Sequence, residues 1–128
     1  DHLANVSRHF TRIPLIQGEV LFESEGHLQH VHFPLSGLVS IVALMDDGTA
    51  IEAATIGPEG AVGLVQALGT GRVFWRALVQ IPGEAMRIER VHLQAIIAES
   101  EVLREVASRY TEAMLMQALQ LVACNALH

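Results

Sequence analysis

Short apolar runs separated by turn residues fill most of the sequence. Polar and apolar residues alternate from Gln29 to Phe33, and Asp46-Asp47-Gly48-Thr49 separates the apolar runs Leu38–Met45 and Ala50–Ile56. Alternation is typical of β-strands, and Asp-Gly between two apolar runs favours a hairpin. Both faces of Leu38–Met45 are apolar, so we expect this strand to be buried on both sides. Short strands with turns at regular intervals predict a mainly β jelly-roll (double-stranded β-helix) barrel.

The other elements of the predicted barrel are shorter. Leu3, Val6 and Phe10 have helical spacing, which favours a short leading helix within residues 1–13. A Pro82-Gly83 turn precedes the last expected strand. The further strands are expected at 14–16, 20–22, 72–80 and 84–88. The predicted barrel domain spans residues 1–100.

The hydrophobic period becomes helical towards the end of the sequence. Val91 to Ile97 favours a short helix, and Ser100 is a suitable N-cap for a second helix from Glu101 to Leu127, a stretch without Pro or Gly. The later part of this helix is apolar on nearly all sides, so more than one surface must cover it. We predict a dimerisation helix over 101–128, because its apolar residues have the spacing of a two-helix seam. The alternative is a monomer that packs this helix on a missing domain. The seam residues are Leu103, Val106, Tyr110, Met114, Gln117 and Leu121.

The stretch from Gly57 to Leu78 combines glycine turns with one short apolar segment. Gly57-Pro58-Glu59-Gly60 ends a strand, Ala61–Leu68 is the apolar segment, and Gly69-Thr70-Gly71 opens a second turn. A strand, a glycine turn, one short helix, a loop and a second strand point helix N-terminal amides into a cavity, where an anion is stabilised.

This stretch resembles the phosphate-binding cassette of the cyclic-nucleotide-binding domain. From about Leu15 to Leu127 the chain resembles the sensor half of a cyclic-AMP-receptor/fumarate-nitrate-regulator type transcription factor. The family cassette reads approximately Gly-Glu-Leu-Gly/Ala-Leu, a variable loop, then Arg-Ser/Ala-Ala; its Glu takes the ribose hydroxyl and its Arg the cyclic phosphate. Here Ala61 stands at the Glu position, Val73 at the Arg position and Phe74 beside it. The resemblance implies the fold without its usual phosphate chemistry.

Two nearby charged residues are the alternatives for the missing Glu and Arg of the cassette. Arg72 is one residue from the Arg position, but a slip of one residue on a strand turns a side chain to the opposite face. Glu59 would need a shift of two residues. We predict no standard binding of a cyclic nucleotide and a neutral or weakly polar ligand, because an unpaired phosphate in an apolar cavity costs several kcal/mol. The expected pocket residues are Gly60, Ala61, Val62, Gly63, Leu64, Arg72, Val73 and Phe74; the alternative is that Val73 and Phe74 fill the pocket by packing.

Charge and cysteine content narrow the function classes. The net charge of −6 at pH 7 offers no basic surface for nucleic acid, so DNA contacts would lie in another domain. The single Cys124 excludes a disulfide within the chain and an all-cysteine iron–sulfur cluster. The sequence opens without a signal peptide, and its most apolar late stretch, 113–127, is too short to span a bilayer. We expect a cytoplasmic protein without membrane contact.

Candidate chemistry outside the cassette is sparse. His30 and His32 share one strand face near His27, a pattern that can hold a metal, although two solvent-facing histidines on an edge strand also explain it. Haem is a further alternative, because one histidine can serve as an axial ligand. Cys124, in the apolar end of the long helix, resembles a buried thiol. We find no nucleophile elbow, paired carboxylates or lysine-bearing phosphate loop, so the sequence predicts no enzyme and no metal site, and it assigns no cofactor.

The resemblance also implies a function and a partner domain. In the resembled family a winged helix-turn-helix follows the long helix, whereas this sequence stops at His128, as a fragment or a stand-alone sensor would. We expect a homodimeric sensor domain of a bacterial-type transcription regulator, in which an unknown small-molecule effector biases the long helices and the DNA-binding domains. The alternatives are a small-molecule-binding module that regulates another protein without a DNA role, and a dimerisation module whose pocket is filled by its own side chains.

Overall fold

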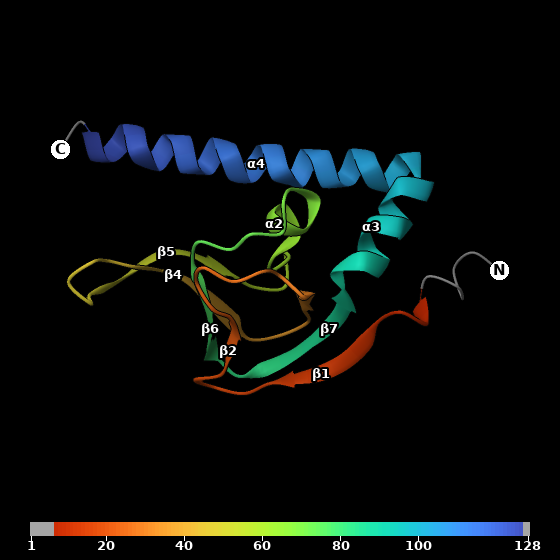
Figure 1. Cartoon of the computed structure of the whole chain (residues 1–128), viewed down its shortest axis with the longest axis horizontal. Helices are drawn as coiled ribbons and strands as arrows, with labels where there is room; N and C mark the ends of the chain where they lie inside the picture. Colours follow the sequence, from red (N-terminus) through yellow and green to blue (C-terminus); the bar gives the residue numbers. More distant parts are fainter. Residues whose placement is uncertain (1–6, 127–128) are drawn as a thin grey trace. The chain divides into compact units, whose positions relative to one another are not determined.

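The computed structural model describes residues 7–126, apart from the side chains at positions 118, 121, 122, 125 and 126. Two antiparallel sheets are formed, one in the order β1-β7-β3 and one in the order β2-β6-β4-β5 (Figure 1). The strands are β1 (Thr11–Leu15), β2 (Val20–Phe22), β3 (His30–Pro34), β4 (Leu38–Leu44), β5 (Ala50–Ile56), β6 (Arg76–Ile81) and β7 (Gly83–Glu89). The predicted mainly β jelly-roll is confirmed. The chain divides into a β domain up to Gln94 and a helical unit from Ala95.

The main core lies between the two sheets. Side chains on β6 alternate between buried and partly exposed, with Ala77 and Val79 pointing inward, and Val79 pairs in register with Val39 of β4. Burying one such aliphatic side chain stabilises the fold by about 1.5–3 kcal/mol. The cluster draws on both sheets and on the segment before the first helix; its members are Leu15, Val39, Ile56, Val62, Ala77, Val79 and Ala85.

The β1-β7-β3 sheet also has an apolar outer face. Val31 of β3 and Ile88 of β7 are register partners and are fully buried. Since side chains alternate along a strand, they lie on the face opposite to Ala85, which belongs to the main core. The rings of Phe10 and Phe33 pack edge to face at 5.9 Å between centroids. This sheet is therefore covered on both sides.

The predictions for the leading helix and for the strand from Leu38 were wrong in detail. The leading helix expected to reach position 13 ends before Thr11, because residues from Thr11 to Leu15 pair with β7; Leu3 and Val6 lie outside the described residues. The strand expected from Leu38 to Met45 ends at Leu44, and only its first half is buried on both faces. In its second half the outer side chains are partly open to solvent.

Tight turns join the strands. The predicted β4–β5 hairpin is present, and the Asp47 carboxylate accepts a hydrogen bond of 2.9 Å from the Thr49 amide. Gly48 in this turn has a φ of +87°, a left-handed conformation that favours glycine. Pro82 alone separates β6 from β7, which belong to different sheets, so the chain crosses from one sheet to the other at this point.

The helices follow the predicted order. They are α2 (Leu64–Leu68), α3 (Arg90–Glu99) and α4 (Glu101–Ala126). The break between α3 and α4 lies at Ser100, whose hydroxyl accepts a hydrogen bond of 3.2 Å from the Leu103 amide. This is the N-cap predicted from the sequence. Among the described residues, no helix combines the length and the apolar content needed to cross a bilayer.

Candidate functional site

The segment that leads into α2 is anchored to β3. The Val62 amide donates to the carbonyl of His32 at 2.7 Å, and the His32 amide donates back to the carbonyl of Val62 at 3.1 Å. Before this bridge, a turn closes with a 3.0 Å hydrogen bond from the Gly60 amide to the Gly57 carbonyl. The polar backbone of the cassette-like segment is thereby satisfied while Val62 points into the core.

Gly63 sets the direction of α2. Its φ of +93° lies in the left-handed region, and an added Cβ would lie 2.9 Å from a methyl carbon of Leu28. A side chain at this position would therefore be strained and would collide with the core. The five-residue helix that follows buries Leu64 and Ala67. Glycine here allows both the turn and the close approach of α2 to the strand region.

The C-terminal end of α2 is held by side chains from the start of α3. The Arg90 guanidinium donates to the carbonyls of Gly69 at 3.2 Å and Ala67 at 3.4 Å, and the Gln94 amide donates to Ala67 at 2.9 Å. These bonds satisfy carbonyls that a helix end leaves without partners. Gly71 has a φ of +81°, and an added Cβ would lie 2.5 Å from the Arg90 guanidinium carbon. Sequence reasoning did not identify Arg90 or Gln94, because their partners are backbone atoms about 20 residues earlier.

The chain that returns from α2 is not a strand at first. The strand predicted from Arg72 begins only at Arg76, so this prediction was wrong. Val73 instead pairs with a turn: its amide donates to the Gly26 carbonyl at 3.0 Å, and its carbonyl accepts from the Glu25 amide at 2.7 Å. The segment before β6 is therefore paired with the turn between β2 and β3 and not with a neighbouring strand.

A small hollow lies between this segment and the turn. It has a volume of about 290 Å³ and is lined by Glu25, Gly26, Arg72, Val73 and Phe74. The guanidinium carbon of Arg72 lies 5.7 Å from the centroid of the Phe74 ring, a cation–π distance. Phe74 is 65% exposed. It therefore does not fill an interior pocket, in contrast to the packing alternative for this residue.

The two positions that carry charge in the resembled family are buried and apolar. Ala61 and Val73 are 6% and 1% exposed. The two charged residues considered as replacements, Glu59 and Arg72, do not lie at these buried positions. The Glu59 carboxylate accepts a hydrogen bond of 3.4 Å from the Gly57 amide, and Arg72 is exposed. The buried part of the predicted site thus consists of Ala61, Val62, Gly63, Leu64 and Val73, while Arg72 and Phe74 face the outer hollow and Gly60 is partly buried.

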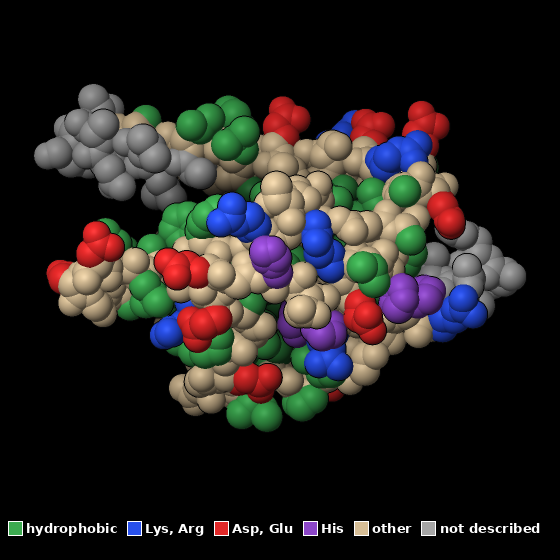
Figure 2. Space-filling view, viewed as in Figure 1, with side chains coloured by type: hydrophobic (Ala, Val, Ile, Leu, Met, Phe, Trp, Pro, Cys, Tyr) green, Lys and Arg blue, Asp and Glu red, His purple; other side chains and the backbone are tan. Residues whose placement is uncertain are grey.

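The histidines of β3 differ from the expectation of two solvent-facing side chains. His32 is only 4% exposed, and its Nδ1 atom has no hydrogen-bond partner among the described residues. Its ring lies 6.4 Å from that of His30, between centroids. Burial, the nearby His30 and the charge of Arg87, in this order, lower the pKa of His32 to about 4. Figure 2 shows other histidine side chains beside arginine side chains on the surface of the β domain. Sequence reasoning missed the burial because the alternation along β3 does not reveal which face meets the core, and His32 lies on the face of Ala85, which belongs to the main core.

The apolar side chains of α4 are the second candidate surface. Leu103 is 37% and Val106 57% exposed, whereas Tyr110 and Met114 are partly buried and Gln117 is exposed. The predicted seam residue Leu121 lies outside the described side chains. Figure 2 shows hydrophobic side chains gathered on α4, where Leu115, Met116 and Leu119 are exposed. The predicted seam stays a prediction.

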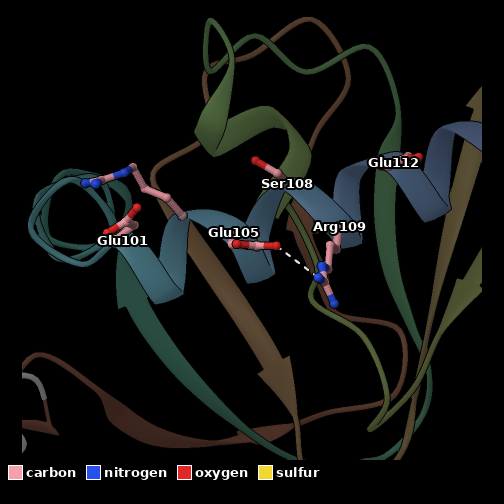
Figure 3. Close-up of a pocket in the computed structure, with 6 residues that line it drawn as sticks. Glu101, Glu105, Ser108, Arg109 and Glu112 are labelled. Carbon is pink, nitrogen blue, oxygen red and sulfur yellow. Dashed lines mark hydrogen bonds and ion pairs between the residues drawn. The ribbon is translucent and has the colours of Figure 1, made fainter.

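α4 also carries a charged face and the cysteine of the chain. Figure 3 shows the acidic, basic and hydroxyl side chains along one side of the helix, where the Arg109 guanidinium donates to Glu105 at 2.9 Å. This charged side of α4 is a solvated helix face. Cys124 is exposed, so the expectation of a buried thiol was wrong. The residues that line this face are Glu101, Arg104, Glu105, Ser108, Arg109 and Glu112.

Comparisons with known proteins agree with this geometry. The sequence model of the cyclic nucleotide-binding domain matches residues 13–100. No protein in the curated set that was compared matches the sequence. A transcriptional regulator from Thermotoga maritima shares the fold with a TM-score of 0.78 at 11% identity, over 98% of each chain.

Two further solved structures show the range of proteins with this fold. The c-di-GMP responsive global regulator CLP from Xanthomonas campestris has a TM-score of 0.74 at 19% identity, over 98% of this chain and 61% of that one. A regulatory subunit of a cAMP-independent protein kinase A from Trypanosoma brucei, as a triple mutant bound to cAMP, has a TM-score of 0.72 at 14% identity, over 91% and 43% of the two chains. Since the family model covers more than half of the sequence, the chain belongs to the cyclic nucleotide-binding domain family.

Proposed function

We propose that this protein is the effector-sensing and dimerisation domain of a bacterial-type transcription regulator, and that its pocket does not bind cyclic AMP in the standard manner of its family. The effector is a small molecule whose binding biases α4 and, through it, DNA-binding domains that belong to another part of the regulator. We infer that the domain acts in the cytoplasm by binding and not by catalysis.

The observation that carries the proposal is the chemistry at two buried positions. The backbone features of a cassette are present, with the left-handed Gly63, the short α2 and the bridge from Val62 to β3. The side chains that should grip the ribose and the phosphate are Ala61 and Val73, both almost completely buried. A cyclic phosphate placed against these two side chains would lose its hydration without a charged partner, which costs several kcal/mol.

A structural neighbour supports this interpretation. The Trypanosoma brucei kinase subunit is described as cAMP-independent, and the form bound to cAMP is a triple mutant in which a threonine is replaced by arginine. A cassette fold can thus exist in a protein that does not depend on cAMP. We propose that the same separation of fold and ligand holds for this chain.

Calorimetry with cyclic AMP and cyclic GMP tests the proposal. The unmodified protein should give no heat of binding, whereas a triple variant, Ala61→Glu, Val73→Arg and Phe74→Ala, restores the family pattern and should bind cyclic AMP. The matched control carries Val73→Gln in place of Val73→Arg, so that it has similar bulk and polarity but no charge. Micromolar binding of either nucleotide to the unmodified protein would overturn the proposal.

We propose that α4 pairs with the α4 of a second copy. Leu103 and Val106 are exposed on the side of α4 away from the charged face of Figure 3, and Met114 follows on this side at helical spacing. A helix with an uncovered apolar side gains by pairing, since apolar area is removed from water.

Analytical ultracentrifugation tests the dimer with two matched variants. Met114→Glu places a charge in the proposed seam, and Ser108→Glu places the same charge on the polar face of the same helix. We expect the unmodified protein and Ser108→Glu to sediment as dimers and Met114→Glu as a monomer. A monomer for the unmodified protein at tens of micromolar would contradict the pairing.

The role in transcription has its own test. The reading frame after His128 should encode a basic helix-turn-helix if the domain belongs to a DNA-binding regulator. A frame that encodes no such domain would favour the alternative, a small-molecule-binding module that regulates another protein.

A further inference from the structure

The inner face of the β1-β7-β3 sheet changes from apolar to polar along its length. Ala85 of β7 belongs to the main core, and Arg87 follows two residues later on the same face. On β3, Pro34 is the register partner of Ala85 and His32 that of Arg87. Register partners in an antiparallel pair point to the same side of the sheet. His32 and Arg87 therefore lie side by side on the face that encloses the core.

The Nδ1 atom of His32 is a buried polar atom without a hydrogen-bond partner in the described part of the chain. It is 96% removed from solvent, given its exposure of 4%, and its Nδ1 atom lacks a hydrogen bond within residues 7–126. Buried nitrogens are almost always hydrogen-bonded, so an exception needs an explanation. Because burial, His30 and Arg87 hold its pKa at about 4, the ring is neutral at pH 7. A neutral imidazole can donate one N–H to a ligand oxygen.

Arg87 adds a positive charge beside this ring and has no salt bridge within residues 7–126. Its side chain is partly buried, and its charge reaches His32, since it contributes to the lowered pKa. The salt bridges found among the described residues use Arg12, Arg76 and Arg109 instead. An arginine on an inward face normally has an anionic partner. The charge also disfavours a metal ion at His32, because two cations would repel each other.

We propose that His32 and Arg87 form an anion-binding subsite in the β domain, and that it takes the carboxylate of a small, otherwise apolar organic acid. Arg87 pairs with the carboxylate through its planar N–H groups, His32 donates from Nδ1, and the apolar part of the ligand packs toward the core near Val62. One positive charge matches a singly charged carboxylate better than a doubly charged phosphate.

This inference deepens the proposed function and rests on it. Because the cassette-like segment has no charged side chain at Ala61 and Val73, an anion would have to be recognised by other strands, here β3 and β7. It differs from the expectation of a neutral or weakly polar ligand. That expectation considered only the residues around Ala61 and Val73 and did not include β3 and β7.

Nuclear magnetic resonance of the His32 ring tests the subsite, with benzoate as the probe and benzamide as its neutral analogue. We expect a saturable shift of the His32 resonances with benzoate, with a dissociation constant in the millimolar range or below, and affinity about tenfold weaker for benzamide. Arg87→Gln should weaken benzoate binding at least about tenfold. Arg12→Gln, an arginine on the neighbouring strand β1 that pairs with Glu84, should leave the affinity unchanged. The absence of a saturable shift, or equal affinity in Arg87→Gln, would overturn the proposal.

Two readouts keep the result unambiguous. The pKa of His32 should rise in Arg87→Gln, since one cause of its lowering is removed, and this rise shows that the variant is folded with position 87 facing the ring. An unchanged pKa would contradict the placement of Arg87. A parallel titration with cyclic AMP separates the two proposals: binding that depends on Arg87 would support the anion subsite and refute the proposed function, while no response to cyclic AMP or to benzoate would refute the subsite alone.

Discussion

Gly71→Ala should destabilise the β domain by more than the conformational cost of placing alanine at this φ angle. A non-glycine residue at a φ of +81° costs about 1–2 kcal/mol. The added Cβ would also lie 2.5 Å from the Arg90 guanidinium carbon, so the guanidinium must leave its place. Loss of its hydrogen bonds to Ala67 and Gly69 adds about 1 kcal/mol, since both are long and partly open to solvent. We expect a total loss of about 2–3 kcal/mol.

Gly48→Ala is the matched control for this prediction. Gly48 has a φ of +87°, and an added Cβ would meet no atom within 4 Å. It should therefore lose only the conformational part, about 1–2 kcal/mol. Urea denaturation at one fixed protein concentration measures both variants, and an unchanged slope of the free energy with urea would show that the unfolded state is comparable.

A double-mutant cycle then assigns the difference to Arg90. In an Arg90→Ala background the guanidinium is absent, so Gly71→Ala should cost no more than Gly48→Ala does. If Gly71→Ala and Gly48→Ala destabilise the protein equally in the native background, the contact between Gly71 and Arg90 does not hold the end of α2. The same conclusion would follow if Arg90→Ala failed to remove the excess.

Three further predictions follow from single positions. The pKa of His32 in the folded protein, about 4, lies below its ordinary value of 6.5, so between these pH values the unfolded chain binds a proton that the folded protein excludes. The free energy of unfolding should therefore fall by up to about 3 kcal/mol as the pH drops from about 6.5 towards 4. Urea titrations of His32→Phe at several pH values should lack this pH dependence if His32 causes it. Ser100→Ala removes the N-cap bond to the Leu103 amide and should cost about 1 kcal/mol, seen as lower helical circular dichroism on heating, whereas an unchanged melt would contradict the capping role. Gly37→Ala should cost more than Gly48→Ala in urea, because its Cβ would lie 2.6 Å from the Ile81 carbonyl oxygen, a backbone atom that cannot rotate away; equal losses would show that the backbone yields there.

Local signals were sufficient for much of the fold. The Asp-Gly pair located the β4–β5 hairpin, and Ser100 located the break before α4, because turns and caps depend on residues close in sequence. The glycines around α2 were enough to suggest the cassette. These are the features for which neighbouring residues determine the backbone conformation.

Long-range pairing explains what the sequence did not reveal. The segment at Val73 has strand-like composition, yet it bonds to the turn at Glu25 and Gly26 and becomes regular only at Arg76. The burial of His32 depends on the pairing of β3 with β7, which places its side chain on the same face as Ala85 of the main core. Arg87 lies within the strand expected at 84–88, and its position beside His32 is visible only when β3 is placed beside β7.

The single-residue connection at Pro82 has a mechanical consequence. One residue spans at most about 3.6 Å, so the end of β6 and the start of β7 cannot separate by more than a short step. β6 continues the chain from the segment at Val73, and β7 carries Arg87. Covalent bonds therefore limit any separation of the two sheets at this end of the barrel, between the strand that follows Val73 and the strand that carries Arg87.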